Sequence, residues 1–77
     1  MVYPLSLESI AMKIEVECED DGRWIAEVPD LPGVMGYGET EKEAVSKVKA
    51  LALRVLADRL EHGEEIPELT ELFAMSA

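Results

Sequence analysis

The sequence has 77 residues, enough for one domain, and its 17 acidic and 7 basic side chains give a net charge of −10. Because this acidity repels phosphate groups, we expect no direct binding to nucleic acid or to an anionic membrane; the charge either steers a basic protein partner or only keeps the protein soluble. No apolar run approaches the roughly 20 residues of a membrane span, and the N-terminus lacks the basic region of a signal peptide, so we expect a cytoplasmic protein.

The single cysteine and the single histidine limit how the chain can be stabilised. Cys18 has no partner for an internal disulfide, and Cys18 and His62 together supply too few ligands for a zinc site. A domain this small covers only about 60–65% of the surface that its unfolded chain exposes. By elimination we expect a homo-oligomer, a dimer or a tetramer, without a metal or another cofactor.

Two strands and a tight turn are predicted after an N-terminal lead-in. Residues 1–11 fit either a short helix or a disordered segment. From residue 12 on, apolar and charged residues alternate, which predicts a strand with Cys18 on its apolar face, in the core. "EDDG" predicts a hairpin turn with Gly22 at positive φ. "RWIAEV" predicts a second strand, whose alternating set on one face is Trp24, Ala26 and Val28.

The stretch "VPDLPGVMGYGET" concentrates residues that restrict or free the backbone. Pro29 lacks the N–H that a strand ladder needs, so the second strand stops there and "PDLPG" forms a constrained loop. "VMGYG" predicts a short third strand, in which Gly36 indicates a bulge or a close backbone approach. We interpret the loop first as scaffold, and alternatively as a rigid loop that exposes Asp30 and Leu31 to a partner.

A long amphipathic helix is predicted from about residue 41 to residue 62. Thr40 and Glu43 have the spacing of a capping box at its start. His62 suits the last turn and Gly63 the position after it. Apolar residues recur at spacings of three and four and form one broad stripe, which consists of Ala44, Val45, Val48, Leu51, Ala52, Val55, Leu56 and Leu60.

The closing segment "GEEIPELTELFAMSA" contains Pro67, which blocks continuation of the helix. "ELFAM" fits a fourth strand at a sheet edge or a short helical tail, and the strand is the preferred interpretation. The sequence therefore predicts a single α+β domain over residues 1–77 with a β-β-β-α-β order. One long helix packs on an antiparallel three-stranded sheet, and a fourth short strand follows.

Residues of the types that enzymes use form no recognisable catalytic arrangement. The dipole of the helix explains His62, and "GYGET" lacks both the lysine of a P-loop and the spacing of a dinucleotide-binding loop. Loop aspartates have ordinary turn roles, which applies to Asp20, Asp21 and Asp30. The outward sheet face carries three glutamates without an acid/base partner, namely Glu15, Glu17 and Glu27. We expect no enzymatic activity, no catalytic residues and no metal site.

An alternating strand, an acidic turn with glycine and the run "RWIAEVPDLPGVMGYGETEKEAVSKVKALALRVL" together resemble the HicB-like antitoxins of HicA–HicB toxin–antitoxin systems. The resemblance covers about residues 12–67, with "GEEIP" after the helix. It implies a partly RNase H-like fold. The motif residues are Pro29, Asp30, Leu31, Pro32, Gly33, Gly38, Thr40, Glu43 and Ala44.

The resemblance also implies a function. A HicB-like antitoxin oligomerises and neutralises a small basic HicA-type mRNA interferase by covering its active surface. The motif residues other than Ala44, together with Trp24, which is either core or interface, are then the candidates for partner binding. Many family members add a C-terminal DNA-binding domain, but only ten residues follow Pro67, so we do not expect one here. An orphan oligomeric domain without a toxin and a residual metal-dependent RNase H-type nuclease stay open as alternatives.

Overall fold

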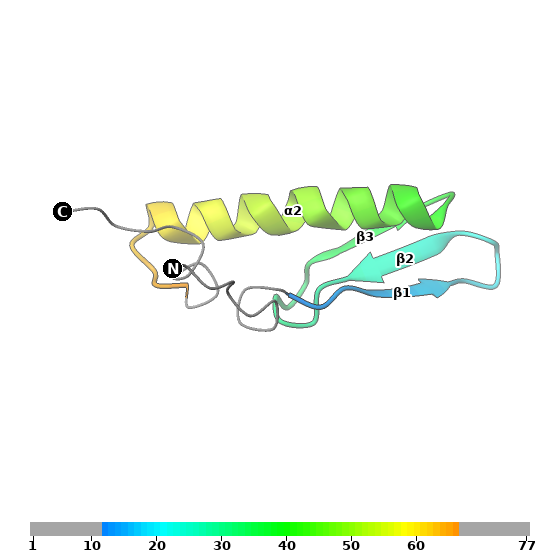
Figure 1. Ribbon diagram of the computed structural model, residues 1–77, viewed down its shortest axis with the longest axis horizontal. Coiled ribbons are helices and arrows are strands. Elements are labelled where there is room, and N and C mark those ends of the chain that lie inside the picture. The colour runs from blue at the N-terminus through cyan, green and yellow to red at the C-terminus, as the bar shows by residue number, and fades with distance from the viewer. Residues whose placement is uncertain (1–11, 67–77) are drawn as a thin grey trace, which may run out of the picture.

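The structure is a computed structural model that describes residues 12–66, three strands followed by one helix (Figure 1). The strands are β1 (Glu15–Cys18), β2 (Trp24–Glu27) and β3 (Met35–Gly38), and the helix is α2 (Glu41–Glu61). The strands form one antiparallel sheet in the order β1-β2-β3, and α2 covers one face of it. The predicted α+β fold is confirmed for these elements. The lead-in and the predicted fourth strand fall on residues outside the described range.

The turn between β1 and β2 has the conformation that "EDDG" predicts. The N–H of Glu19 donates to the carbonyl of Arg23 at 2.6 Å, and the N–H of Gly22 donates to the carbonyl of Glu19 at 2.9 Å. Gly22 has a φ of 90°, which closes the loop and returns the chain into the ladder.

The "PDLPG" loop between β2 and β3 consists of two consecutive turns that share Leu31. The N–H of Leu31 donates to the carbonyl of Val28 at 2.9 Å, and the N–H of Val34 donates to the carbonyl of Leu31 at 3.0 Å. A proline occupies the second position of each turn, where its fixed φ is suitable. Gly33 follows the second proline with a φ of 85°, as a type II turn requires.

The two turns bury Leu31, which keeps only 2% of its surface exposed. The prediction that Leu31 is exposed beside Asp30 is therefore wrong. Two proline-led turns in succession direct the residue between them inwards, where it closes the end of the core. Asp30 is exposed, as expected.

Both ends of α2 are capped by the residues that the sequence indicates. The N–H of Glu43 donates to Oγ1 of Thr40 at 3.1 Å. The Glu43 carboxylate accepts from the N–H of Glu39 at 3.0 Å, so the reciprocal bond of the box is made one residue before the cap. After the helix, Gly63 and Glu64 donate to the carbonyls of Leu60 and Arg59, which is the Schellman pattern.

The side chains on the inner face of the sheet become smaller towards β3, and this determines where the helix lies. Across the strands the side chains in one register row shrink from Val16 to Ala26 to Gly36. A Cβ at Gly36 would lie 3.2 Å from the backbone nitrogen of Val48, and one at Gly38 would lie 2.5 Å from that of Ala44. The predicted close approach at Gly36 is confirmed, with regular pairing and no bulge, because only glycine lets the helix backbone come this near.

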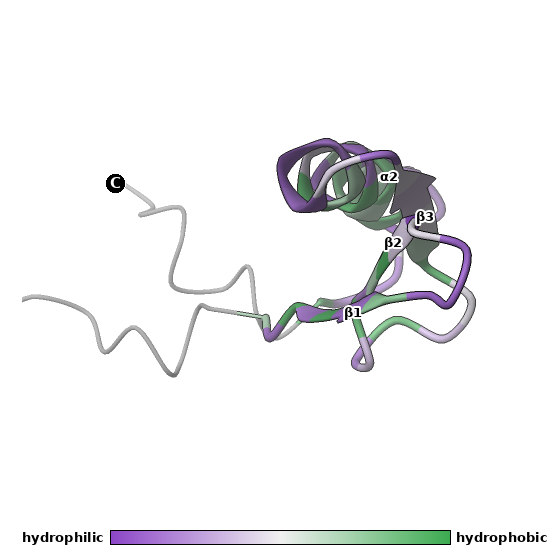
Figure 2. Ribbon diagram, turned by 90° about the vertical axis from the view of Figure 1, so that its right-hand side faces the viewer, coloured by the Kyte–Doolittle hydropathy of each residue, from purple (hydrophilic) through white to green (hydrophobic). Residues whose placement is uncertain are grey.

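The core lies between α2 and the β2–β3 half of the sheet, and Figure 2 shows the helix above this half. Val48 is fully buried, and Trp24 packs half-buried against the same cluster. The buried residues are Ala26, Val28, Leu31, Val34, Ala44, Val48, Ala52, Leu56 and Ile66.

Two predicted core residues lie at the surface instead. Cys18 has the predicted face, because its register partner is Trp24, but it is exposed since α2 barely reaches β1. Leu60 is 47% exposed because it lies where the helix extends past the sheet-covered stripe. The rest of the predicted stripe is buried or half-buried.

Candidate protein-binding surfaces

The outer face of the sheet, opposite α2, combines large apolar side chains with carboxylates. The β1–β2 register places Glu15 opposite Glu27 and Glu17 opposite Ile25. The β2–β3 register continues both rows, with Met35 beside Glu27 and Tyr37 beside Ile25. Residues paired in register share a face, so these six side chains form one continuous surface, which we call the outer face.

The apolar part of the outer face is partly exposed to solvent. Met35 and Tyr37 are 41% and 42% exposed, and Ile25 is half-buried. The guanidinium carbon of Arg23 lies 5.0 Å above the centre of the Tyr37 ring, a cation–π contact that holds the ring in place.

The acidic part of the outer face surrounds a hollow of about 330 Å³ over β1 and β2. Lys13 lies beside it, with its Nζ 3.5 Å from a carboxylate oxygen of Glu15 and with both side chains at least half exposed. Such an exposed pair contributes little to stability. The hollow is lined by Glu15, Val16, Glu17, Ile25 and Glu27.

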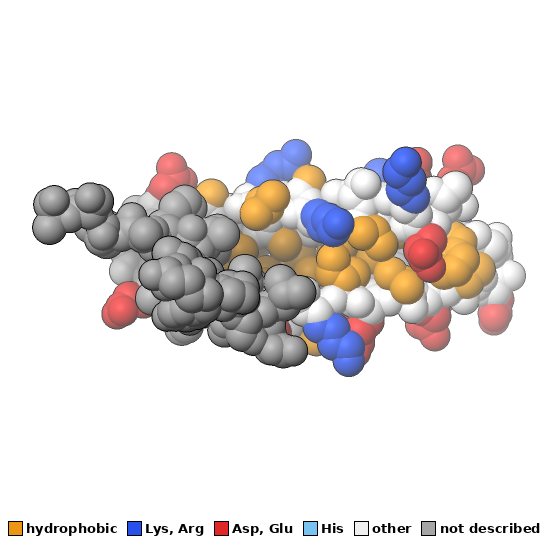
Figure 3. Space-filling model, in the orientation of Figure 1, with side chains coloured by type: hydrophobic (Ala, Val, Ile, Leu, Met, Phe, Trp, Pro, Cys, Tyr) orange, Lys and Arg blue, Asp and Glu red, His pale blue; other side chains and the backbone are white. Residues whose placement is uncertain are grey.

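A second exposed surface lies on the helix side of the sheet, between α2 and β1. Figure 3 shows apolar side chains along this band. Val16 is 41% exposed although its register partner Ala26 is fully buried. We call this band the trough. It exists because α2 packs along β3 and β2 and leaves β1 mostly uncovered.

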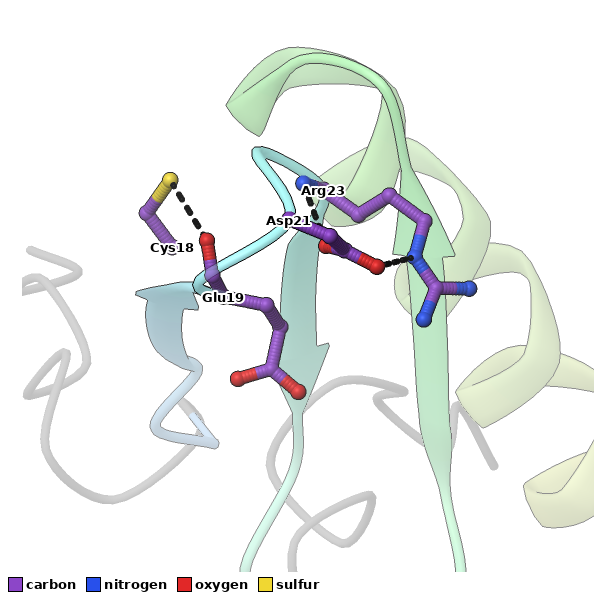
Figure 4. Close-up of polar contacts among 4 residues, drawn as sticks. All are labelled: Cys18, Glu19, Asp21 and Arg23. Atoms are coloured by element: carbon purple, nitrogen blue, oxygen red, sulfur yellow. Dashed lines mark hydrogen bonds and ion pairs between the residues drawn. The ribbon is translucent and has the colours of Figure 1, made fainter.

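The hairpin turn at the end of β1 is held by a compact charged group (Figure 4). Asp21 accepts from the backbone N–H of Arg23 at 3.0 Å and from its Nε at 2.8 Å. These contacts, the backbone hydrogen bond first, hold the pKa of Asp21 below its ordinary value of 3.8. Asp21 and Arg23 thus act in the turn, as loop aspartates usually do.

Most of the predicted partner-binding residues act in turns, caps and the core. Pro29, Pro32 and Gly33 shape the double turn, where Leu31 is buried. Gly38 lies under the first turn of α2, which Thr40 and Glu43 cap. Trp24 points to the helix side and is half-buried. The structure does not bring these residues together into one exposed surface, although their role in binding stays a prediction.

The sequence interpretation missed the apolar half of the outer face. Met35 and Tyr37 alternate with Gly36 and Gly38, and this phase was a usable signal. Because glycines occupy the helix side of β3, the two large side chains must point the other way. Within residues 12–66 no three His, Cys, Asp or Glu side chains gather as metal ligands, and no described helix is long and apolar enough to cross a membrane.

Comparisons with known proteins identify the family. Residues 12–77 match the family described as "HicB_like antitoxin of bacterial toxin-antitoxin system". The chain belongs to the HicB-like antitoxin family. Family membership implies a toxin as partner, and it confirms the resemblance that the motif around Pro29 and Gly38 indicates.

Similar proteins agree with this assignment. A UPF0150 protein of Thermoplasma acidophilum is 35% identical over 49 residues, which cover 64% of this chain and 71% of that protein. A UPF0150 protein of Synechocystis is 37% identical over 46 residues, covering 60% and 64%. The crystal structure of the N-terminal domain of the Burkholderia pseudomallei antitoxin HicB superposes with a TM-score of 0.66 at 28% identity, covering 83% of this chain and 69% of that one.

Proposed function

We propose that this protein neutralises a small, basic HicA-type mRNA interferase by binding it and covering its active surface. The observation that supports this proposal is family membership together with a net charge of −10. An anionic protein attracts a cationic partner over long range and speeds their encounter. The role is binding rather than catalysis, and we place it in the cytoplasm, where an mRNA-cleaving toxin would act.

The described residues give no competing support to a nuclease. His62 lies at the end of α2, where its Nδ1 is 2.7 Å from the carbonyl oxygen of Asp58. This contact accounts for the histidine as part of the helix terminus. Glu15, Glu17 and Glu27 share a face but do not gather as metal ligands.

A second candidate function is that of an orphan oligomer without a toxin. The trough favours it, because Val16 and Cys18 leave apolar surface on β1 that another copy would cover. A dimer or tetramer is also compatible with the first proposal.

Co-expression with a HicA-type toxin tests the proposal. We expect growth to be restored and the two proteins to be purified together. Weaker capture at higher salt would agree with electrostatic attraction. Continued growth arrest together with the absence of a complex would contradict the antitoxin role, and a stable oligomer under those conditions would support the orphan domain.

A further inference from the structure

We propose that the outer face is the surface that docks on the toxin, and that its acidic hollow receives an arginine or lysine side chain of the toxin. This inference rests on the proposed function and specifies where the partner binds. Ile25, Met35 and Tyr37 form the apolar centre of the contact. The carboxylates that receive the cation are Glu15, Glu17 and Glu27.

The apolar centre supplies the part of an interface that gains most from losing water. Methionine and tyrosine are enriched in protein–protein interfaces, and here each keeps about two fifths of its surface in water, 41% for Met35 and 42% for Tyr37. The register joins them to Ile25 and Glu27, so they are adjacent rather than scattered. The Tyr37 ring is already held by Arg23, which lowers the entropy that ordering it on binding would cost.

The acidic part carries a charge conflict that a cation would relieve. Glu15 and Glu27 are direct cross-strand partners, and like charges in this position destabilise a sheet. Among residues 12–66, Glu17 and Glu27 have no ion-pair partner, and Glu15 has only the exposed contact with Lys13. The hollow of about 330 Å³ lies between these carboxylates and Ile25. A long basic side chain packs its methylenes on an apolar residue while its charged end meets carboxylates.

Charge separates the outer face from the trough as the docking site for a basic protein. The inner-face residues of β1 and β2 are Val16, Cys18, Trp24 and Ala26, none of which is charged. The trough therefore offers no carboxylate of the sheet to a cation. The outer face is also carried by three hydrogen-bonded strands, two of which, β2 and β3, are backed by α2, so it is formed before the partner arrives.

Two triple variants of equal charge test the inference. The first replaces the outer-face carboxylates, Glu15→Lys, Glu17→Lys and Glu27→Lys. The control replaces three exposed glutamates at the end of α2 and beyond it, Glu61→Lys, Glu64→Lys and Glu65→Lys. Each replacement adds two units of charge, so both variants carry −4 instead of −10. The lost general attraction is the same in both, and only the location differs.

Titration of a purified HicA-type toxin against the wild type and both variants measures the dissociation constant of each complex. We expect the Kd of the outer-face variant to rise by about 100-fold and that of the control by less than about 5-fold. Met35→Ala adds a charge-neutral variant, for which a rise of about 10-fold is expected. Circular dichroism and the urea midpoint of each variant establish that it is folded.

The outcomes separate the two proposals. Failure of the wild type to bind the toxin contradicts the proposed function. Binding by the wild type with equal losses in both triple variants overturns the docking site but keeps the function. Sedimentation of the free proteins tests whether a second copy of this chain occupies the outer face instead. If the outer-face variant loses a self-association that the control retains, a second copy occupies the face and the inference is wrong.

Discussion

β1 and β3 are the two edge strands of the described sheet, yet α2 packs closely on β3 and leaves β1 mostly uncovered. In one register row β1 carries Cys18 and β3 carries Gly38, with Trp24 between them. Gly38 is buried under α2, whereas Cys18 is exposed. One helix covers about two strands, and the strand without side chains on that face is the one it approaches most closely. In a domain of this size, the placement of glycine therefore decides which strand is in the core.

Gly38→Val is expected to have the largest effect on stability, because it adds a side chain where α2 packs on β3. A Cβ at Gly38 lies 2.5 Å from the backbone nitrogen of Ala44, so the helix must move away from β3. We expect the free energy of unfolding in urea to fall by about 3 kcal/mol or more. Cys18→Val, in the same register row on β1, is the control and should change it by less than about 0.5 kcal/mol. Equal effects would show that α2 does not distinguish the two strands.

The same valine-to-alanine truncation on α2 and on β1 measures how much each buried surface contributes to stability. Val48 is completely buried and Val16 is 41% exposed. We expect Val48→Ala to cost about 2–3 kcal/mol and Val16→Ala less than about 1 kcal/mol. Urea unfolding monitored by Trp24 fluorescence measures both. A cost at Val16 as large as that at Val48 would mean that β1 is covered in solution, for example by another copy.

Thr40→Ala tests the start of the helix over β3. It removes the acceptor that Glu43 uses at 3.1 Å, so we expect a loss of about 1 kcal/mol. Ser46→Ala, an exposed serine inside α2, serves as the control and should be neutral or slightly stabilising. Thermal unfolding monitored at 222 nm compares the two. An unchanged melting temperature in Thr40→Ala would argue against the cap.

The smallest effect is expected at the β1–β2 turn, where it is present at neutral pH and is lost in acid. Because the folded-state pKa of Asp21 is lowered from 3.8, its contribution to stability is complete above the unfolded-state value and is lost as pH falls through the lower folded-state value. The difference in unfolding free energy between wild type and Asp21→Asn should therefore shrink below about pH 3.8. Arg23→Gln should reduce this pH dependence without abolishing it, since the backbone N–H remains. A difference that does not vary with pH would contradict the assignment.

Local patterns in the sequence were sufficient to predict the strands and the helix of residues 12–66. Alternation predicted β1 and β2, Gly22 predicted the hairpin turn, and Thr40 and Gly63 predicted the ends of α2, because each feature depends on neighbours within a few residues. The sequence left two interpretations of Gly36 open, a bulge and a close backbone approach, and the structure shows the second.

Burial was harder to predict because it depends on where α2 settles over the sheet. Cys18 has the predicted face but the wrong environment, and Leu31 is buried because two turns direct it inwards. The apolar half of the outer face was missed because Met35 and Tyr37 look like core residues by composition alone. The phase relative to Gly36 and Gly38 is the sequence feature that would have corrected this.

The strand order β1-β2-β3 has a kinetic consequence. Every strand pairing among the described residues joins neighbours along the chain, and α2 follows directly after the strand that it contacts most. Each contact therefore closes only a short loop, and the entropy lost before packing begins is small. Such a topology folds on the order of milliseconds or faster. A molecule unfolded by heat would therefore refold before its exposed apolar side chains meet those of most other unfolded molecules.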